Sequence, residues 1–269
     1  MPLLRATVLA LAVLAAGCAA APSLKTAAHE GVSFTYRAAD FDGVEVKQRR
    51  KLTAQEIGDG IDEGIAPAHF CFHLKARHPL PALEQGPRYF FPAPSFVCAI
   101  PLQDDSVADF GETYPGLPRS AARLRTLLRE RPAQAALRGA FPDLPPNNAG
   151  RSFLSRFQYL EFRSGSGIAF LTQYSQEIEP NPVNNEELML VFQGLTDDGR
   201  YYVAARLAIT HPSLPRGIDF TDAIERDRQW RYLKQGEKDL DRLPEDSFRP
   251  PLSALKDLLS SLSVGPAQP

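Results

Sequence analysis

Three residues with metal-binding side chains alternate along one short segment: His69, Cys71 and His73. In an extended strand, residues two positions apart point to the same face. A thiolate with two imidazoles is a ligand set that zinc or copper accepts. The competing interpretation pairs Cys71 with Cys98 in a disulfide, which removes the thiolate, so the two interpretations exclude each other. We favour the disulfide and predict neither a metal site nor a cofactor.

A second group carries amide and phenol side chains close together in sequence, near the ends of predicted strands, where ligands are often bound. These possible binding residues are Gln173, Tyr174, Gln176, Asn184 and Asn185. The alternative is structural, and we favour it: the two asparagines cap a turn that follows nearby prolines, and the tyrosine packs with its hydroxyl outward. Alanine substitutions separate the two interpretations, because binding residues tolerate them without loss of stability.

A serine hydrolase requires a nucleophile on a sharp turn, a histidine within reach and a carboxylate behind it. The chain has no G-x-S-x-G motif, and Ser164 and Ser166 lie in a tight SGSG turn. His211 precedes a proline at a predicted strand end, where a turn histidine is the simpler explanation. There is also no P-loop, dinucleotide fingerprint or H-E-x-x-H motif. No motif identifies a reaction, so we expect a non-enzymatic binding or assembly module, with an envelope hydrolase as the alternative.

The elements that hold these residues are clearest in the second half of the chain. Strand-like segments at 153–162, 168–174, 187–195 and 200–210 predict an antiparallel meander. Leucines at helical spacing predict a helix at 119–131, before these strands, and another at 251–262, after them, and a further helical segment is expected at 219–235. A helix, then a strand meander, then further helices is an order typical of packed layers. We therefore predict an α+β fold, an antiparallel sheet covered on one face by helices, rather than a parallel βαβ arrangement. Residues 31–265 form a single domain, with a possible weak boundary at the proline-rich linker 142–150.

The N-terminus begins MPLLRATVLALAVLAAGC, a basic residue followed by an apolar run and small residues, which predicts a signal peptide over residues 1–17. The residues before Cys18 resemble the bacterial lipobox, although Ala15 stands where leucine is usual. The resemblance implies that Cys18 carries a diacylglyceryl group and an N-linked acyl chain such as palmitate. Residues 18–30 are then a tether. Ala19 implies the outer membrane, facing the periplasm, as the destination within the bacterial cell envelope.

Composition excludes one class of partner. The chain of 269 residues has 30 Lys and Arg against 32 Asp and Glu, a net charge of -2, so it lacks the basic footprint of a nucleic-acid binder. The mildly acidic body is not expected to bind anionic lipid by its overall charge. The expected partners are the membrane, through the N-terminal lipid, and an envelope protein or small ligand. Beyond the signal, no segment is long and apolar enough to span a bilayer.

A run of motifs in residues 153–215 carries a family resemblance. The strings are GIAFLTQYSQ from Gly167, NNEEL from Asn184, FQGLTDDGRYYVAA from Phe192 and HPSLP from His211. They resemble a group of uncharacterised bacterial exported and lipid-anchored proteins, and the strand order is similar to the PsbP/Mog1-like α+β fold. The resemblance implies export and lipid anchoring but no activity, since a shared fold does not transfer a function.

Overall fold

The computed structural model describes residues 21–51, 67–78, 95–102, 117–134, 137, 150–175, 182–217 and 226–265. The predicted signal peptide, Cys18, Gln176 and residues 142–149 of the predicted boundary lie outside the described residues.

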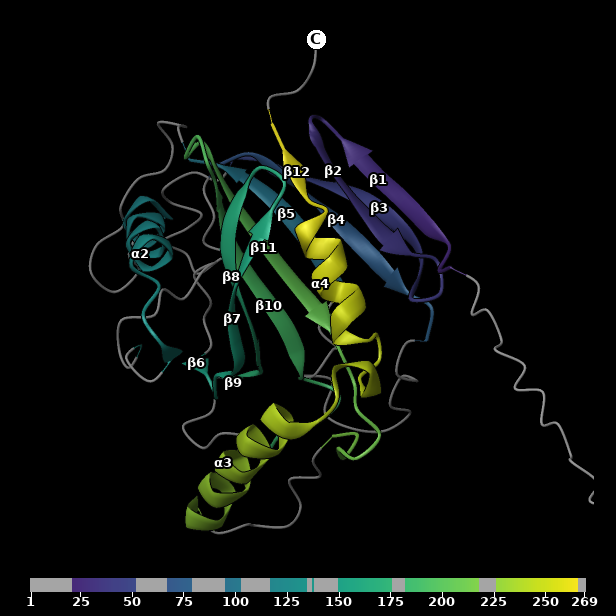
Figure 1. Cartoon of the computed structure of the whole chain (residues 1–269), viewed down its shortest axis with the longest axis vertical. Coiled ribbons are helices and arrows are strands. Elements are labelled where there is room, and N and C mark those ends of the chain that lie inside the picture. The colour runs from purple at the N-terminus through teal and green to yellow at the C-terminus, as the bar shows by residue number, and fades with distance from the viewer. Residues whose placement is uncertain are drawn as a thin grey trace, which may run out of the picture.

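The centre of the protein is a seven-stranded antiparallel sheet with the order β3-β4-β5-β11-β10-β8-β7 (Figure 1). Its strands are β3 (Phe41–Arg49), β4 (His69–Ala76), β5 (Ser95–Pro101), β7 (Ser155–Phe162), β8 (Gly165–Thr172), β10 (Met189–Thr196) and β11 (Tyr201–Ala208). The last four are neighbours in chain order, which confirms the predicted α+β class and the C-terminal meander. β5 pairs with β11 and so joins the N-terminal strands to the meander.

Two smaller sheets complete the β structure. A three-stranded sheet contains β1 (Leu24–His29), β2 (Val32–Arg37) and β12 (Ser263–Val264), and a two-stranded sheet pairs β6 (Gly150–Arg151) with β9 (Tyr174–Ser175). β1 corrects the predicted tether, because residues 24–29 pair with β2 as part of the folded domain. The sequence pattern did not predict this strand. Only Ala27 of its six residues is buried, so the segment lacks a clear alternation of apolar and polar residues.

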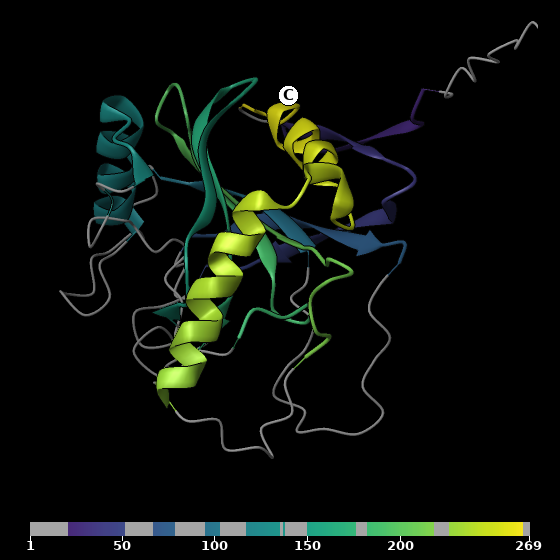
Figure 2. The ribbon, with the colours of Figure 1, turned by 60° about the horizontal axis from the view of Figure 1, so that its bottom comes forward.

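Helices lie on both faces of the large sheet (Figure 2). On one face, α4 (Leu252–Ser260) packs against β2 and β7, and α3 (Arg226–Arg242) against β7, so the C-terminal helices cover one face as predicted. On the other face, α2 (Leu117–Glu130) packs against β8 and β10. The short 3-10 helix η2 (Glu245–Ser247) precedes α4. Among the described helices, none has the length and apolarity needed to cross a bilayer.

Both faces of β4 are packed. Phe70, Phe72 and Leu74 alternate along the strand and are buried in one core, where Phe72 packs edge-to-face against Phe34 of β2 with 5.1 Å between ring centroids. The opposite face also packs, because α2 and its neighbours form a second core that contains Cys71. His69 is also buried.

Close approach of β8 and β10 depends on glycine. Gly167 and Gly194 are directly opposite each other in the ladder. A Cβ atom added at Gly167 would lie 2.4 Å from Cζ of Phe192, and one added at Gly194 would lie 2.8 Å from Cε1 of the same ring. The Phe192 ring therefore occupies the space that side chains would fill, and it packs edge-to-face with Phe162 at 5.8 Å between centroids. This packing holds β8 against β10, which is the neighbour of β11 in the sheet.

Candidate functional site

Cys71 and Cys98 form a disulfide, as predicted. The two residues are directly opposite in the β4–β5 ladder, with their Cα atoms 4.1 Å apart. The bond consumes the thiolate that a metal site at His69, Cys71 and His73 would require. His69 uses its Nδ1 atom in a 2.8 Å hydrogen bond with the carbonyl oxygen of Pro67. Within the described ranges, no group of three His, Cys, Asp or Glu side chains is arranged to hold a metal ion.

Asn184 organises a tight turn. Its Oδ1 atom accepts hydrogen bonds from the backbone N–H groups of Glu186 at 3.0 Å and Glu187 at 3.1 Å. Its Nδ2 atom donates to the carbonyl oxygen of Pro182 and to the Glu187 carboxylate. Both ends of the amide are engaged within the turn, which is the usual local role of asparagine. The structural interpretation of Asn184 therefore has direct support.

Asn185 joins the same turn to the segment after β11. Its Nδ2 atom donates to the carbonyl oxygens of His211 at 3.1 Å and Leu214 at 3.0 Å, and its Oδ1 atom accepts the His211 backbone N–H at 2.7 Å. Gln173 is fully buried, and its Nε2 atom donates to the Pro182 carbonyl oxygen at 3.2 Å. These amides are thus part of the scaffold. Of the predicted binding group, Tyr174 lies apart from this turn, on β9.

His211 is the histidine closest to a hydrolase arrangement, since its Nε2 atom lies 2.9 Å from the Ser247 hydroxyl. Its Nδ1 atom, however, accepts the backbone N–H of Ser213 at 3.1 Å and is therefore unprotonated. Nε2 then carries the hydrogen and donates it to Ser247, whose own hydroxyl donates to the Pro244 carbonyl at 2.6 Å. A general base must accept the proton of its nucleophile. The pair is therefore arranged as a structural hydrogen-bond chain.

The serines of the SGSG turn are also accounted for in part. Ser164 Oγ accepts the backbone N–H of Val264 at 2.8 Å, which attaches β12 to the β7–β8 turn.

Burial lowers the pKa of His211 below its ordinary value, with a further lowering from the Arg249 charge. A neutral, buried histidine in a hydrogen-bond chain stabilises the fold in its neutral form.

A different group of side chains has unused binding capacity. The guanidinium carbon of Arg206 lies 5.0 Å from the ring centroid of Tyr174 and 5.8 Å from that of Phe96. Its Nε atom is buried without a hydrogen-bond partner, and no carboxylate in the described part of the chain forms an ion pair with it. A half-buried cation whose described neighbours are two aromatic rings and no anion is unusual, because buried charges are normally paired.

Tyr202 adds a second unused donor. Its side chain is fully buried, and its hydroxyl has no hydrogen-bond partner among the described residues. Burial raises the pKa of the Tyr202 phenol well above its ordinary value, Tyr174 raises it further, and the charge of Arg206 opposes them. The phenol is therefore a neutral O–H donor at physiological pH. A buried polar group without a partner costs about 1–3 kcal/mol, which an acceptor atom would recover.

The strands explain how these residues meet. Tyr202 and Arg206 lie four positions apart on β11, so both face the side of the sheet that carries the second core. Phe96 on β5 is directly opposite Arg206 in the ladder, and the Cys71–Cys98 disulfide joins β4 to β5 on this face. Tyr174 is held by the β6–β9 pairing opposite Arg151. We call Phe96, Tyr174, Tyr202 and Arg206 the Arg206 cluster.

Sequence reasoning identified Tyr174 but missed the other three members. One signal was available: Arg206 interrupts an otherwise apolar strand, on the same face as Tyr202. A charge in a central strand indicates either an ion pair or a site. The positions of Phe96 and Tyr174 around it depend on the pairing of distant segments, which spacing does not reveal.

Comparisons with protein-family models, with curated proteins and with solved structures find no match for this chain. The chemistry of the site therefore carries the functional argument. Among the described residues, the Arg206 Nε–H and the Tyr202 hydroxyl are donors without an acceptor, and aromatic rings lie beside Arg206. Such an arrangement suits an oxyanion next to a flat apolar group.

Proposed function

We propose that this protein is a lipid-anchored module of the bacterial cell envelope that binds an anionic ligand without transforming it. The export signal, with Cys18 as the acylated residue, supports the location. The Cys71–Cys98 disulfide supports it independently, since disulfides persist in oxidising compartments outside the cytosol. Ala19 favours the outer membrane. The ligand is a small molecule or an exposed group of an envelope protein.

The observation that carries the binding proposal is the Arg206 guanidinium, which has two aromatic neighbours and no anionic partner in the described residues. Guanidinium groups bind carboxylates and phosphates in bidentate fashion, and the charge assistance strengthens both hydrogen bonds. The Tyr202 hydroxyl supplies a further donor. A ligand oxyanion would therefore accept hydrogen bonds from donors that the described part of the chain leaves without an acceptor.

The same chemistry favours binding over catalysis. The Arg206 cluster contains a cation, two phenols and a phenyl ring, and none of these is a nucleophile activated by a neighbouring base. His211 donates to Ser247 through Nε2, which is the wrong direction for activation of the serine. A binding module is thus the function that the described geometry supports best.

Isothermal titration calorimetry with benzoate and phenyl phosphate tests the binding proposal, with benzamide as the neutral comparison. Wild-type protein is expected to bind at least one of the two anions saturably and to ignore benzamide. Arg206→Gln is expected to lose this binding. Arg200→Gln, an exposed arginine at the start of the same hairpin arm, is the matched control and should bind as wild type does. Absence of binding to both anions, or equal binding by Arg206→Gln, overturns the proposal.

The location is tested separately by intact mass and membrane partition after expression in a bacterial host. Wild-type protein should carry an acylated Cys18 and partition with membranes, whereas Cys18→Ala should be released to the soluble fraction. An unacylated mature mass for the wild type contradicts the lipid anchor and leaves the Arg206 proposal to its own test.

A further inference from the structure

α3 presents aromatic side chains to solvent. Among the described residues, the large hydrophobic side chains classed as exposed are Leu24, Trp230 at 42% and Tyr232 at 47%, so two of the three lie on this helix. The inner side of the same helix is anchored, with Leu233 and Leu240 fully buried in the core. Asp241 adds a 2.6 Å hydrogen bond from the Ser155 hydroxyl on β7. The exposed rings therefore belong to a helix that is firmly attached to the sheet.

Basic side chains surround these rings. Trp230, Lys234 and Lys238 follow one another at four-residue intervals and so form one line along the helix. Arg231 lies beside that line, and Arg228 contacts Tyr232, with its Nε atom 3.3 Å from the tyrosine hydroxyl. The four basic residues are exposed, and Lys234 and Lys238 form no ion pair in the described part of the chain. We call residues 228, 230, 231, 232, 234 and 238 the α3 face.

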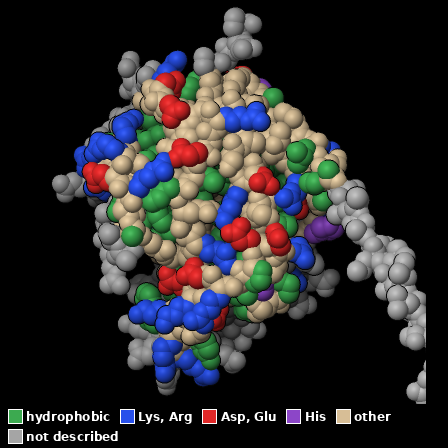
Figure 3. Space-filling model, in the orientation of Figure 1, with side chains coloured by type: hydrophobic (Ala, Val, Ile, Leu, Met, Phe, Trp, Pro, Cys, Tyr) green, Lys and Arg blue, Asp and Glu red, His purple; other side chains and the backbone are tan. Residues whose placement is uncertain are grey.

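The α3 face is a local basic region on a protein whose net charge is slightly negative. In the space-filling view, blue side chains gather at the lower end of the molecule, where α3 lies, with green side chains beside them (Figure 3). α3 also carries acidic residues beside this face: Asp239 accepts a 2.8 Å hydrogen bond from Gln235, and Glu237 interacts electrostatically with Lys234 and Lys238. Basic side chains outnumber acidic ones along the helix. Attraction to an anion at this end is therefore a property of the α3 face and not of the whole protein.

We infer that the α3 face docks on the surface of an anionic phospholipid bilayer. Tryptophan and tyrosine prefer the headgroup level, where the ring is apolar and its N–H or O–H remains hydrated. Lysine and arginine are attracted to anionic headgroups while their aliphatic stems cover apolar surface. The α3 face combines both features, and its inner side is already occupied by the core. This contact is distinct from the Arg206 cluster and does not require acylation of Cys18.

The experiment uses the full chain carrying Cys18→Ala, so that no acyl chain contributes to binding. Trp230 is the single tryptophan of the protein, so its fluorescence reports directly on the α3 face. Vesicles of phosphatidylcholine with phosphatidylglycerol are expected to shift the emission to shorter wavelength and to co-sediment with the protein. Vesicles of phosphatidylcholine alone should do neither, and high salt should reverse the binding.

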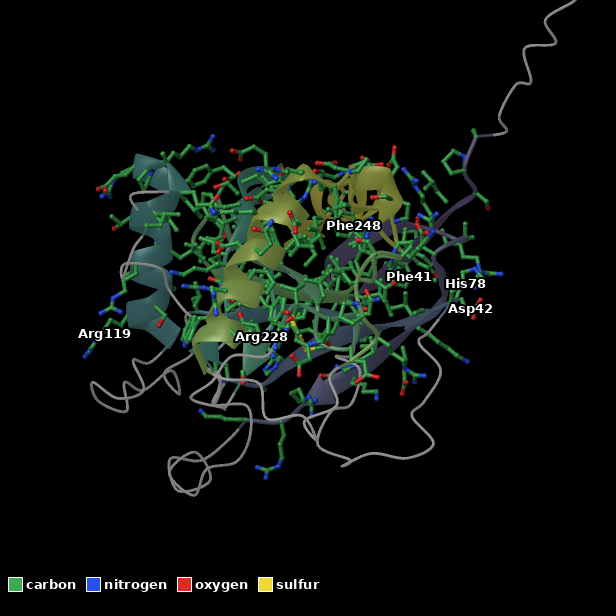
Figure 4. All side chains as sticks on the ribbon, turned by 90° about the horizontal axis from the view of Figure 1, so that it is seen from below. Phe41, Asp42, His78, Arg119, Arg228 and Phe248 are labelled. Carbon is green, nitrogen blue, oxygen red and sulfur yellow. A yellow bond between two sulfur atoms is a disulfide. The ribbon has the colours of Figure 1, made fainter. Side chains whose placement is uncertain are left out.

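Charge reversal on two helices separates a specific face from a general charge effect. Lys234→Glu with Lys238→Glu is expected to weaken vesicle binding by about tenfold or more. Arg123→Glu with Arg125→Glu makes the same charge change on the exposed side of α2 and should leave binding within about threefold of the parent. The two helices lie in different parts of the molecule, as Arg119 on α2 and Arg228 on α3 show in Figure 4. Thermal unfolding of each variant verifies that it folds.

Three results would overturn the inference. One is an unchanged Trp230 emission with anionic vesicles. Another is an equal loss of binding in the α2 and α3 variants, which would mean that overall charge governs the contact. The third is a response to a soluble polyanion such as heparin without a response to vesicles, which would assign the face to a different class of partner.

Discussion

Substitution of Gly167 tests the packing that holds β8 against β10. A Cβ atom at this position would lie 2.4 and 2.5 Å from two ring carbons of Phe192 and 2.6 Å from the carbonyl oxygen of Gln193. The Phe192 ring is enclosed by the packed core and has little room to move, and the Gln193 carbonyl belongs to β10 in the β8–β10 ladder. Gly167→Ala therefore forces both a side chain and the backbone to move.

The magnitude follows from two opposing terms. Overpacking of a core costs about 1–3 kcal/mol. Replacing glycine by alanine within a strand returns about 0.5–1 kcal/mol through the lower entropy of the unfolded chain. Because the contact at Gly167 involves backbone as well as side-chain atoms, the upper part of the cost applies. We expect Gly167→Ala to lower the free energy of unfolding by about 1–2 kcal/mol.

Urea unfolding followed by far-UV circular dichroism measures this change at constant slope. Gly43→Ala in β3 is the matched control, because a Cβ atom there meets nothing within 4 Å, and it should be neutral or slightly stabilising. In a Phe192→Leu background, Gly167→Ala should cost less, although the Gln193 carbonyl contact keeps the rescue partial. If Gly167→Ala proves as stable as Gly43→Ala, the proposed packing is wrong.

Three further outcomes are expected. Replacing Cys71 and Cys98 together by alanine should lower the free energy of unfolding by about 3–4 kcal/mol, because the bonded cysteines are separated by 27 positions. The double variant should also unfold identically with and without reductant. A loss of stability under about 1 kcal/mol contradicts this expectation. The pKa of His211 is lowered in the folded state. The contribution of His211 to the free energy of unfolding is therefore complete above the pKa of the unfolded chain, about 6.5, and declines as the pH falls through that value. His211→Gln should therefore flatten the dependence of the melting temperature on pH in that range, and a parallel curve would refute the assignment. Asn185→Ala removes three hydrogen bonds and should cost about 2–3 kcal/mol in urea unfolding; an unchanged midpoint would return Asn185 to the binding candidates.

Some features could be predicted because they depend on local pattern. The alternation of Phe70, Phe72 and Leu74 identifies a core-facing strand, and the turn chemistry between 196 and 199 identifies the β10–β11 hairpin. Two cysteines, in a chain whose N-terminus predicts export, predict the disulfide. In each case the signal lies within a few residues of the element that it specifies.

Other features depend on contacts between distant segments. β1 has one buried residue, so its strand conformation comes from pairing with β2 and not from its own pattern. The second face of the sheet is buried because α2 packs there, which the sequence of β4 does not indicate. The Arg206 cluster unites residues of β5, β9 and β11, and only the strand order brings Phe96 opposite Arg206. In the sequence, Asn184 and Asn185 resemble ligand-binding residues, because the amide groups that bind ligands also form the hydrogen bonds of turns.

The most direct test of the central claim observes Arg206 itself. The Nε–H signal of this residue in a nitrogen-15 NMR spectrum can be assigned by its absence from Arg206→Gln. Titration with benzoate should move that signal saturably, while benzamide leaves it in place, because the anion would supply the acceptor that the described residues do not provide. A signal that stays unchanged while benzoate binds elsewhere, or that never responds to benzoate, contradicts an anion site at the Arg206 cluster.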